Sequence, residues 1–134
     1  MAKKLFISCP MAGRSEENIR KSMEKMHRIA EIVFNQELEV LPTYTEHKPP
    51  ENAKASIWYL GHSIQVMADA DYFIGINEYS DFFKGCESEK SIAMSYGIER
   101  TFINMRALMP DALKAESEYW KNQDKHEIKQ ASMI

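Results

Sequence analysis

Apolar residues are distributed along this chain in two alternating patterns. Short, mostly apolar runs, bounded by proline, glycine or polar residues, occupy positions 5–8, 38–41, 72–76 and 101–104. Between these runs, apolar residues recur at every third or fourth position over residues 15–34, 54–70 and 87–96. The short runs are typical of strands buried on both faces, and the wider spacing is typical of amphipathic helices. The pattern therefore predicts strands and helices in alternation.

Such alternation is characteristic of a parallel sheet that is covered by helices on both faces. Because the crossovers between parallel strands are right-handed, few topologies remain. We expect an α/β protein with a flavodoxin-like, three-layer α/β/α fold and a mostly parallel sheet of strand order 2-1-3-4, to which a fifth short strand can be added. Residues 1–134 are expected to form one domain, with a charged, helix-favouring tail from about residue 110.

Composition narrows the classes of partner. The chain is 44% apolar and 28% charged, with a formal net charge of −3. It has no basic stripe interleaved with aromatic residues, so duplex nucleic acid is not an expected partner. No apolar run approaches the roughly 20 residues that a membrane-spanning helix needs. The two cysteines do not make a disulfide framework, and we expect a cytoplasmic protein with both thiols reduced.

The expected topology also places the ligand site. In parallel sheets, ligands bind beyond the carboxyl ends of the two strands at which the strand order reverses. Here those are the first and third strands. The segments that follow them, residues 8–15 and 77–89, are therefore expected to face each other across a cleft that binds a small molecule.

The first of these segments, residues 8–15, leads directly into a helix for which Ser15 is a good N-cap. Backbone N–H groups at a helix start, with Arg14 beside them, suit a phosphate or carboxylate group. The same spacing fits a plain strand-to-helix turn in which Gly13 takes an unusual conformation and Arg14 is solvated, and spacing alone favours this structural interpretation. The candidate ligand-binding residues here are Ser8, Cys9, Pro10, Met11, Gly13, Arg14 and Ser15.

The second segment ends in Gly85-Cys86-Glu87-Ser88-Glu89, at the expected start of a helix. Gly85 allows a ligand to approach the backbone closely. The positive end of the helix dipole would favour the ionised form of Glu89 in the first turn. An ionised carboxylate at the mouth of the cleft is able to attack a sugar C1′ or to stabilise an oxocarbenium-like centre. Glutamates are also common in first turns for structural reasons alone, and Glu87 shares this ambiguity.

Other residues near the same sheet edge extend the list of candidates. Loop aromatics stack on nucleobases without regard to base identity, although they also form oligomer contacts. A Cys–His nucleophile pair is a minor alternative to small, buried, unreactive thiols. No His, Cys or Asp spacing matches a metal site, and no cofactor is expected. The remaining binding candidates are Tyr44, His47, Asn77, Tyr79, Phe82, Phe83, Gly85 and Cys86, with His62 as a candidate proton donor and Asp71 as a structural residue.

Three segments resemble the nucleoside 2-deoxyribosyltransferase-like family, and more narrowly its short members in phage and bacterial genomes. They are residues 6–13 (FISCPMAG), residues 70–74 (ADYFI) and residues 85–89 (GCESE) with Ala93. The resemblance implies a flavodoxin-like fold, a nucleoside or nucleotide ligand, and cleavage or transfer at the N-glycosidic bond. The Gly-x-x-x-Glu pattern of that family falls on Gly85 and Glu89, which makes Glu89 the candidate nucleophile.

The chain departs from the catalytic pattern of that family at three positions. Phe6 stands where a tyrosine is usual, Ser63 where an aspartate is usual, and Phe83 where the transferases often carry an acid. General acid–base assistance is worth ~10²–10⁴ in rate, so these losses favour an alternative in which the protein binds a nucleotide-derived, ADP-ribose-type molecule without turnover. His62 is the candidate to replace the missing acid. The aromatic pair 58–59, like the resemblance, predicts a homo-oligomer.

Overall fold

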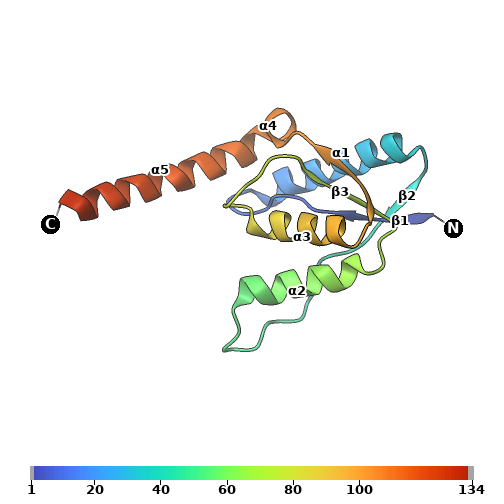
Figure 1. Cartoon of the computed structure of the whole chain (residues 1–134), viewed down its shortest axis with the longest axis horizontal. Helices are drawn as coiled ribbons and strands as arrows, with labels where there is room; N and C mark the ends of the chain where they lie inside the picture. Colours follow the sequence, from blue (N-terminus) through green and yellow to red (C-terminus); the bar gives the residue numbers. More distant parts are fainter. Residues whose placement is uncertain (1, 133–134) are drawn as a thin grey trace.

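The computed structural model describes residues 2–132, with side chains described through residue 123. Strands and helices alternate as the apolar pattern predicts, and two helices close the chain (Figure 1). In order, the elements are β1 (Lys3–Ile7), α1 (Glu16–Phe34), β2 (Leu38–Val40), α2 (Ala55–Met67), β3 (Tyr72–Ile76), α3 (Lys84–Ser95), β4 (Glu99–Ile103), α4 (Met105–Leu108) and α5 (Pro110–Ser132).

All the strand pairs of the sheet are parallel, and the strand order is β2-β1-β3-β4. In the centre of the sheet, Leu5 of β1 is in register with Val40 of β2 and with Tyr72 of β3. The expected α/β architecture and strand order are therefore confirmed, and the arrangement is that of a flavodoxin-like three-layer fold. Within residues 2–132 the sheet has four strands, and the optional fifth strand does not form.

Helices cover both faces of the sheet, and the alternation of side chains along β1 and β3 supplies one apolar cluster to each face. The first cluster joins Leu5, Ile7, Ile74 and Ile76 to Met26 and Ala30 of α1. The second joins Phe6 and Phe73 to Met67 of α2 and Ala93 of α3. Figure 1 shows α1 on one side of the sheet and α2 and α3 on the other. Because both faces are buried, the central strands need apolar residues at nearly every position.

Helix α3 begins three residues earlier than the sequence predicts, at Lys84 instead of residue 87. A polar turn around Ser80 prepares this start, since the Phe83 N–H donates to Ser80 Oγ at 3.0 Å and the Ser80 N–H donates to Glu87 Oε1 at 3.0 Å. The sequence obscures this start because Lys84 and Gly85 look like loop residues. As a result, Glu89 lies in the second turn of α3 and not in the first.

Helix α5 confirms the helical tail expected from about residue 110, and Figure 1 shows its far end projecting away from the sheet. The short helix α4 was not predicted. It forms where the Glu78 carboxylate accepts hydrogen bonds from the N–H groups of Met105 and Arg106, at 2.9 and 2.8 Å. Among the described residues, no helix combines the length and the apolar character that crossing a membrane requires.

Candidate functional site

A cavity of about 380 Å³ lies beyond the carboxyl ends of β1 and β3. The first loop, residues 8–15, forms one wall of it, and the second loop, residues 77–83, forms the opposite wall together with the start of α3. Helix α2 closes the third side. The two segments that the sequence predicts to face each other do so. The cavity is lined by Ile7, Cys9, Met11, Ala12, Thr43, Ser56, Tyr59, Leu60, Ser63, Phe82, Phe83, Lys84, Gly85, Cys86 and Glu89.

Glu89 is the single carboxylate among these lining side chains. Its Oε1 accepts a hydrogen bond from the hydroxyl of Ser8 at 2.7 Å. Ser8 is itself buried, and it lies two residues after Phe6, so that its side chain leaves β1 on the face covered by α2 and α3. The end of β1 and the second turn of α3 thus hold the Glu89 carboxylate in place from two sides.

Burial raises the pKa of Glu89 to about 7, and hydrogen bonds from the hydroxyls of Ser8 and Ser63 oppose part of that rise. The sequence predicts the opposite shift of this pKa, because a position in the first helical turn favours the ionised form. Desolvation outweighs that effect, since the helix begins earlier than predicted and the carboxyl group lies inside the cavity. Near neutral pH both protonation states of Glu89 are therefore populated. The ionised form is a nucleophile, and the protonated form is a proton donor.

Helix α2 contributes a polar stripe that the sequence analysis largely missed. Ser56, Tyr59 and Ser63 are spaced by three and four residues and all face the cavity. Ser63 occupies the position where the resemblance implies an aspartate, and it does lie beside Glu89. Tyr59, which we had taken as part of an oligomer contact, lines the cavity with its ring edge-on to Trp58. The three-to-four spacing of polar residues in an otherwise apolar helix was the signal available for finding this stripe.

A second compartment of about 830 Å³ adjoins the first. The two share Met11, Thr43, Tyr59 and Ser63. The second compartment extends over the end of β2 and is bordered by the loop that follows that strand, with Tyr44, Glu46 and Lys48 among its lining residues. Tyr44 is thus placed in a compartment next to Glu89, as a side chain that is 82% exposed.

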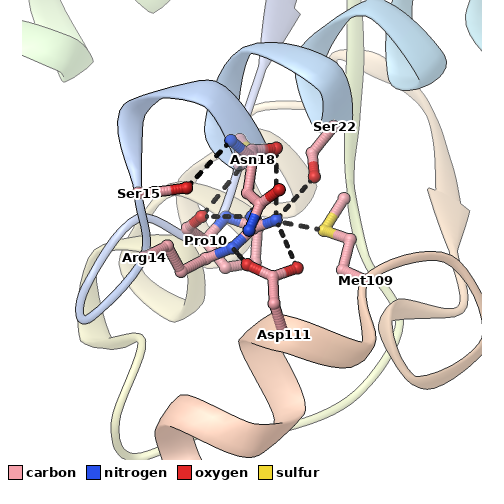
Figure 2. Close-up of polar contacts among 8 residues, drawn as sticks. Pro10, Arg14, Ser15, Asn18, Ser22, Met109 and Asp111 are labelled. Carbon is pink, nitrogen blue, oxygen red and sulfur yellow. Dashed lines mark hydrogen bonds and ion pairs between the residues drawn. The ribbon is translucent and has the colours of Figure 1, made fainter.

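Arg14 does not lie in either compartment, which is a correction to its expected role at a phosphate. Its side chain is only 1% exposed. Nε and Nη2 donate to the two carboxylate oxygens of Asp111 at 2.7 and 3.0 Å, while further donors bind the Pro10 carbonyl and the Ser22 hydroxyl (Figure 2). These contacts hold the pKa of Asp111 below its usual range. With its donors committed to protein groups, Arg14 has a structural role.

Other residues of the first loop also serve the fold. The hydroxyl of Ser15 accepts from the Asn18 N–H at 3.2 Å, which confirms the predicted N-cap (Figure 2). Gly13 has a φ of 71°, in the left-handed region that favours glycine. Pro10 is fully buried. Of the candidate residues in this loop, Cys9 and Met11 line the cavity, and Ser8 reaches it through Glu89.

The two candidate histidines lie elsewhere. His47 and His62 line a separate hollow of about 420 Å³, together with Trp58 and other residues from the opposite side of α2. The Nε2 atom of His62 is buried and has no hydrogen-bond partner among the described residues. Because Ser63 faces Glu89, the neighbouring residue in the helix turns away from it. His62 therefore does not replace the missing acid in this arrangement.

The candidate residues of the second loop are also divided between those that line the cavity and those that do not. Phe82 and Phe83 line the cavity with their rings edge-on at 4.9 Å, although Phe83 also belongs to the buried core. Tyr79 is 74% exposed and donates to the Asp81 carboxylate. Asn77 closes β3, where its N–H donates to the Ile103 carbonyl at 2.8 Å. Neither Asn77 nor Tyr79 lines the two compartments.

Gly85 sits at the cavity edge with open space around it, because a Cβ atom added there would meet no heavy atom within 4 Å. The open space at Gly85 leaves room for the close backbone approach that the sequence predicts for a ligand. Phe6 is fully buried in the core and stacks on Phe73 at a centroid distance of 5.8 Å. It does not line the cavity.

The cysteines are structural in this arrangement. Burial raises the pKa of Cys9 to about 11 and also raises the pKa of Cys86, so both thiols stay protonated at neutral pH. Neither shares a cavity with His47 or His62, which argues against a Cys–His pair. Asp71 is structural as well, since its Oδ2 accepts from the Lys4 N–H at 2.8 Å.

The site therefore consists of a part-buried carboxylate with a raised pKa, two serine hydroxyls beside it, and an aromatic and apolar lining. Within the described part of the chain, no three His, Cys, Asp or Glu side chains are grouped closely enough to hold a metal ion. The chain matches no family model, no curated protein and no solved structure.

Proposed function

We propose that this protein cleaves or transfers at the N-glycosidic bond of a nucleoside, with Glu89 as the nucleophile. The observation that carries the proposal is the position of Glu89 inside the cavity at the carboxyl ends of β1 and β3, hydrogen-bonded to Ser8 at 2.7 Å. Buried carboxylates with raised pKa values cluster at functional sites. The same function is supported by the resemblance of residues 6–13, 70–74 and 85–89 to the nucleoside 2-deoxyribosyltransferase-like family.

In the proposed reaction, an ionised oxygen of Glu89 attacks C1′ of the sugar. The bond between C1′ and the base nitrogen breaks, the electron pair of that bond stays with the base, and a glycosyl ester of Glu89 forms. Water or a second base then attacks C1′ and releases the carboxylate. The departing base takes a proton from water or a lining hydroxyl, because the described lining offers no second carboxyl group. General acid assistance is worth ~10²–10⁴ in rate, so we expect slow turnover.

The surroundings of the site favour an uncharged nucleoside over a nucleotide. Arg14, the side chain expected to hold a 5′ phosphate, is committed to Asp111. Among the side chains that line the Glu89 cavity, Lys84 is the single basic one. The volume of about 380 Å³ falls within the range of roughly 300–1,000 Å³ that is typical of small-molecule sites.

A binding protein for a nucleotide-derived, ADP-ribose-type molecule is the second candidate. It is favoured by the adjoining compartment of about 830 Å³, which exceeds what a nucleoside occupies and which Lys48 borders. It is also favoured by Phe6, Ser63 and Phe83, which leave Glu89 without the usual acidic partners. In this function Glu89 and the serine hydroxyls would bind sugar hydroxyl groups without reaction.

The two candidates are separated by incubating the protein with deoxynucleosides, ribonucleosides, their monophosphates and ADP-ribose, and then measuring free base by chromatography. We expect base release from an unphosphorylated nucleoside and its loss in Glu89→Gln. Glu24→Gln, which changes an exposed carboxylate of α1, is the matched control and should retain the activity. A large thermal shift with a ligand recovered intact would support the binding protein instead. The absence of any response to the whole panel would contradict both.

A further inference from the structure

Helix α5 touches both loops that wall the Glu89 cavity, through side chains on one of its faces. Asp111 binds Arg14 of the first loop. Ala115 lies against Gly13, since a Cβ atom on that glycine would come within 3.1 Å of the Ala115 Cβ. These two contacts are four residues apart, about one helical turn, and both reach residues 13–14.

The next part of α5 reaches the second loop. The hydroxyl of Ser80 donates to Glu116 Oε1 at 3.1 Å. The ring of Tyr119 packs against the ring of Phe82 with a centroid distance of 4.9 Å. Phe82 lines the cavity, and Ser80 accepts the hydrogen bond from the Phe83 N–H that precedes α3. The first half of α5 therefore bridges the two walls from outside the cavity.

The contact at Arg14 is the strongest of the four. The guanidinium makes a two-pronged ion pair with Asp111, and it also donates to the Pro10 carbonyl at 2.8 Å and the Ser22 hydroxyl at 2.7 Å (Figure 2). Planar two-pronged pairs fix geometry as well as adding energy. Because Pro10 lies between the cavity residues Cys9 and Met11, this pair holds the backbone of the cavity wall itself.

We infer that the first half of α5, residues 110–119, is a positioning element that sets the spacing of the two cavity walls, with Arg14 and Asp111 as positioning residues for the first loop and Tyr119 for the second. The ligand that the walls would enclose rests on the proposed function. The positioning of the two loops by α5 does not rest on that function, because it concerns which segments become mobile when a contact is removed. A readout that is independent of catalysis is therefore needed to test it.

The test is hydrogen–deuterium exchange, followed by mass spectrometry of peptides, on the full chain. Arg14→Met keeps the buried aliphatic stem and removes the charge, leaving the partly exposed Asp111 to be solvated. We expect exchange in residues 9–14 to accelerate by about tenfold or more, because local opening sets the exchange rate there. Tyr119→Ala should accelerate exchange in residues 78–83 instead. In both variants β3, residues 72–76, should exchange as in the wild type.

Arg20→Met is the matched control, since Arg20 forms an exposed ion pair with Glu24 on α1 and should alter neither loop. If Arg14→Met does not fold, Arg14→Lys, which keeps the charge but loses the two-pronged geometry, takes its place with a smaller acceleration expected.

Unchanged exchange in residues 9–14 and 78–83 would overturn the inference. So would a uniform acceleration that includes residues 72–76, because that pattern is general destabilisation. If the wild type releases base, Arg14→Met should also raise KM while the pH midpoint set by Glu89 stays in place. If the wild type releases no base, the proposed function fails, and the exchange pattern still decides the role of α5.

Discussion

Two ionisable side chains lie near the same edge of the sheet, Arg14 buried and Glu89 largely buried, and their surroundings are opposite. Arg14 is paired with the carboxylate of Asp111 and also donates to a carbonyl and a hydroxyl. Glu89 has the hydroxyls of Ser8 and Ser63 as its polar neighbours. Among the described residues, it takes part in no ion pair. The pKa of the carboxyl in the first pair is lowered by its partner, whereas burial raises the pKa of Glu89 to about 7.

This difference separates a charge that is committed to holding the fold together from an ionisable group that is left without a charged partner beside a cavity. A buried charge that is fully paired still carries a desolvation cost, which its partner offsets, so that removal of the partner is strongly destabilising. A largely buried carboxylate without a cation is costly to ionise, and such groups cluster at functional sites. The sequence left Arg14 between a ligand-binding role and a solvated position in a structural turn, and the structure instead buries it in an ion pair with Asp111.

The largest expected effect is on the Arg14 side of the comparison. Asp111→Ala should lower the free energy of unfolding by about 3–5 kcal/mol, because it leaves the guanidinium of Arg14 buried without its counterion. Thermal or denaturant unfolding measures this. Arg20→Met, in an exposed pair, should cost less than about 1 kcal/mol. Equal effects of the two substitutions would show that burial of Arg14 does not matter to stability.

Glu89→Gln should raise the free energy of unfolding, whereas Asp111→Ala lowers it, and the size of the increase should depend on pH. The pKa of Glu89 is raised from 4.5 to about 7, so the folded wild type loses stability as the pH rises between these values and ionisation favours the unfolded chain. Glu89→Gln avoids that loss and should be more stable than the wild type above pH 7, by up to about 3 kcal/mol. Below pH 4.5 the two proteins should unfold alike. A stabilisation that is independent of pH would show that Glu89 is not buried as described.

Ser8→Ala should have a smaller effect and should sharpen the assignment of the Glu89 pKa. The Ser8 hydroxyl donates to the carboxylate and lowers its pKa, so its removal should move the Glu89 titration to higher pH, as followed by carboxyl ¹³C NMR. The cost in stability should be about 1 kcal/mol, which is typical of one hydrogen bond. Ser91→Ala, at an exposed position of the same helix, should leave the titration unchanged.

Gly85→Ala should have the smallest effect on stability and a clear effect on ligand binding. Alanine is better than glycine inside a helix, and the added Cβ meets open space, so the protein should gain about 0.5–1 kcal/mol. The same methyl group would project at the cavity edge and weaken the thermal shift caused by a bound nucleoside. Gly61→Ala in α2, also in open space, should give the stability gain without the loss of binding.

Several features of the site followed from the sequence because they depend on local patterns and on topology. The short apolar runs predicted the strands, and right-handed crossovers left few strand orders, which placed residues 8–15 and the start of α3 at one sheet edge. Glu89 was identified from its place in that arrangement together with the family resemblance, because its position alone fitted a structural role equally. The cap at Ser15 needed only the three residues that follow it.

Other features could not follow from the sequence, because the partners are distant along the chain. Arg14 and Asp111 are 97 positions apart, and nothing in the spacing of either residue indicates the other. The start of α3 was misplaced for a local reason, since Lys84 and Gly85 look like loop residues and the turn around Ser80 that precedes the helix was not recognised. The polar stripe on α2 was overlooked because the sequence does not show which side of α2 faces α3 and the cavity.

The sequence by itself determined the four strands, the main helices and the order of the strands, because hydrophobic periodicity and short right-handed connections can be recognised along the chain. The tertiary structure alone decided which charges are paired, which are desolvated and which side of α2 faces Glu89. Those properties depend on what packs around a group, and for Arg14 and Glu89 that environment comes from segments 97 and 81 residues away.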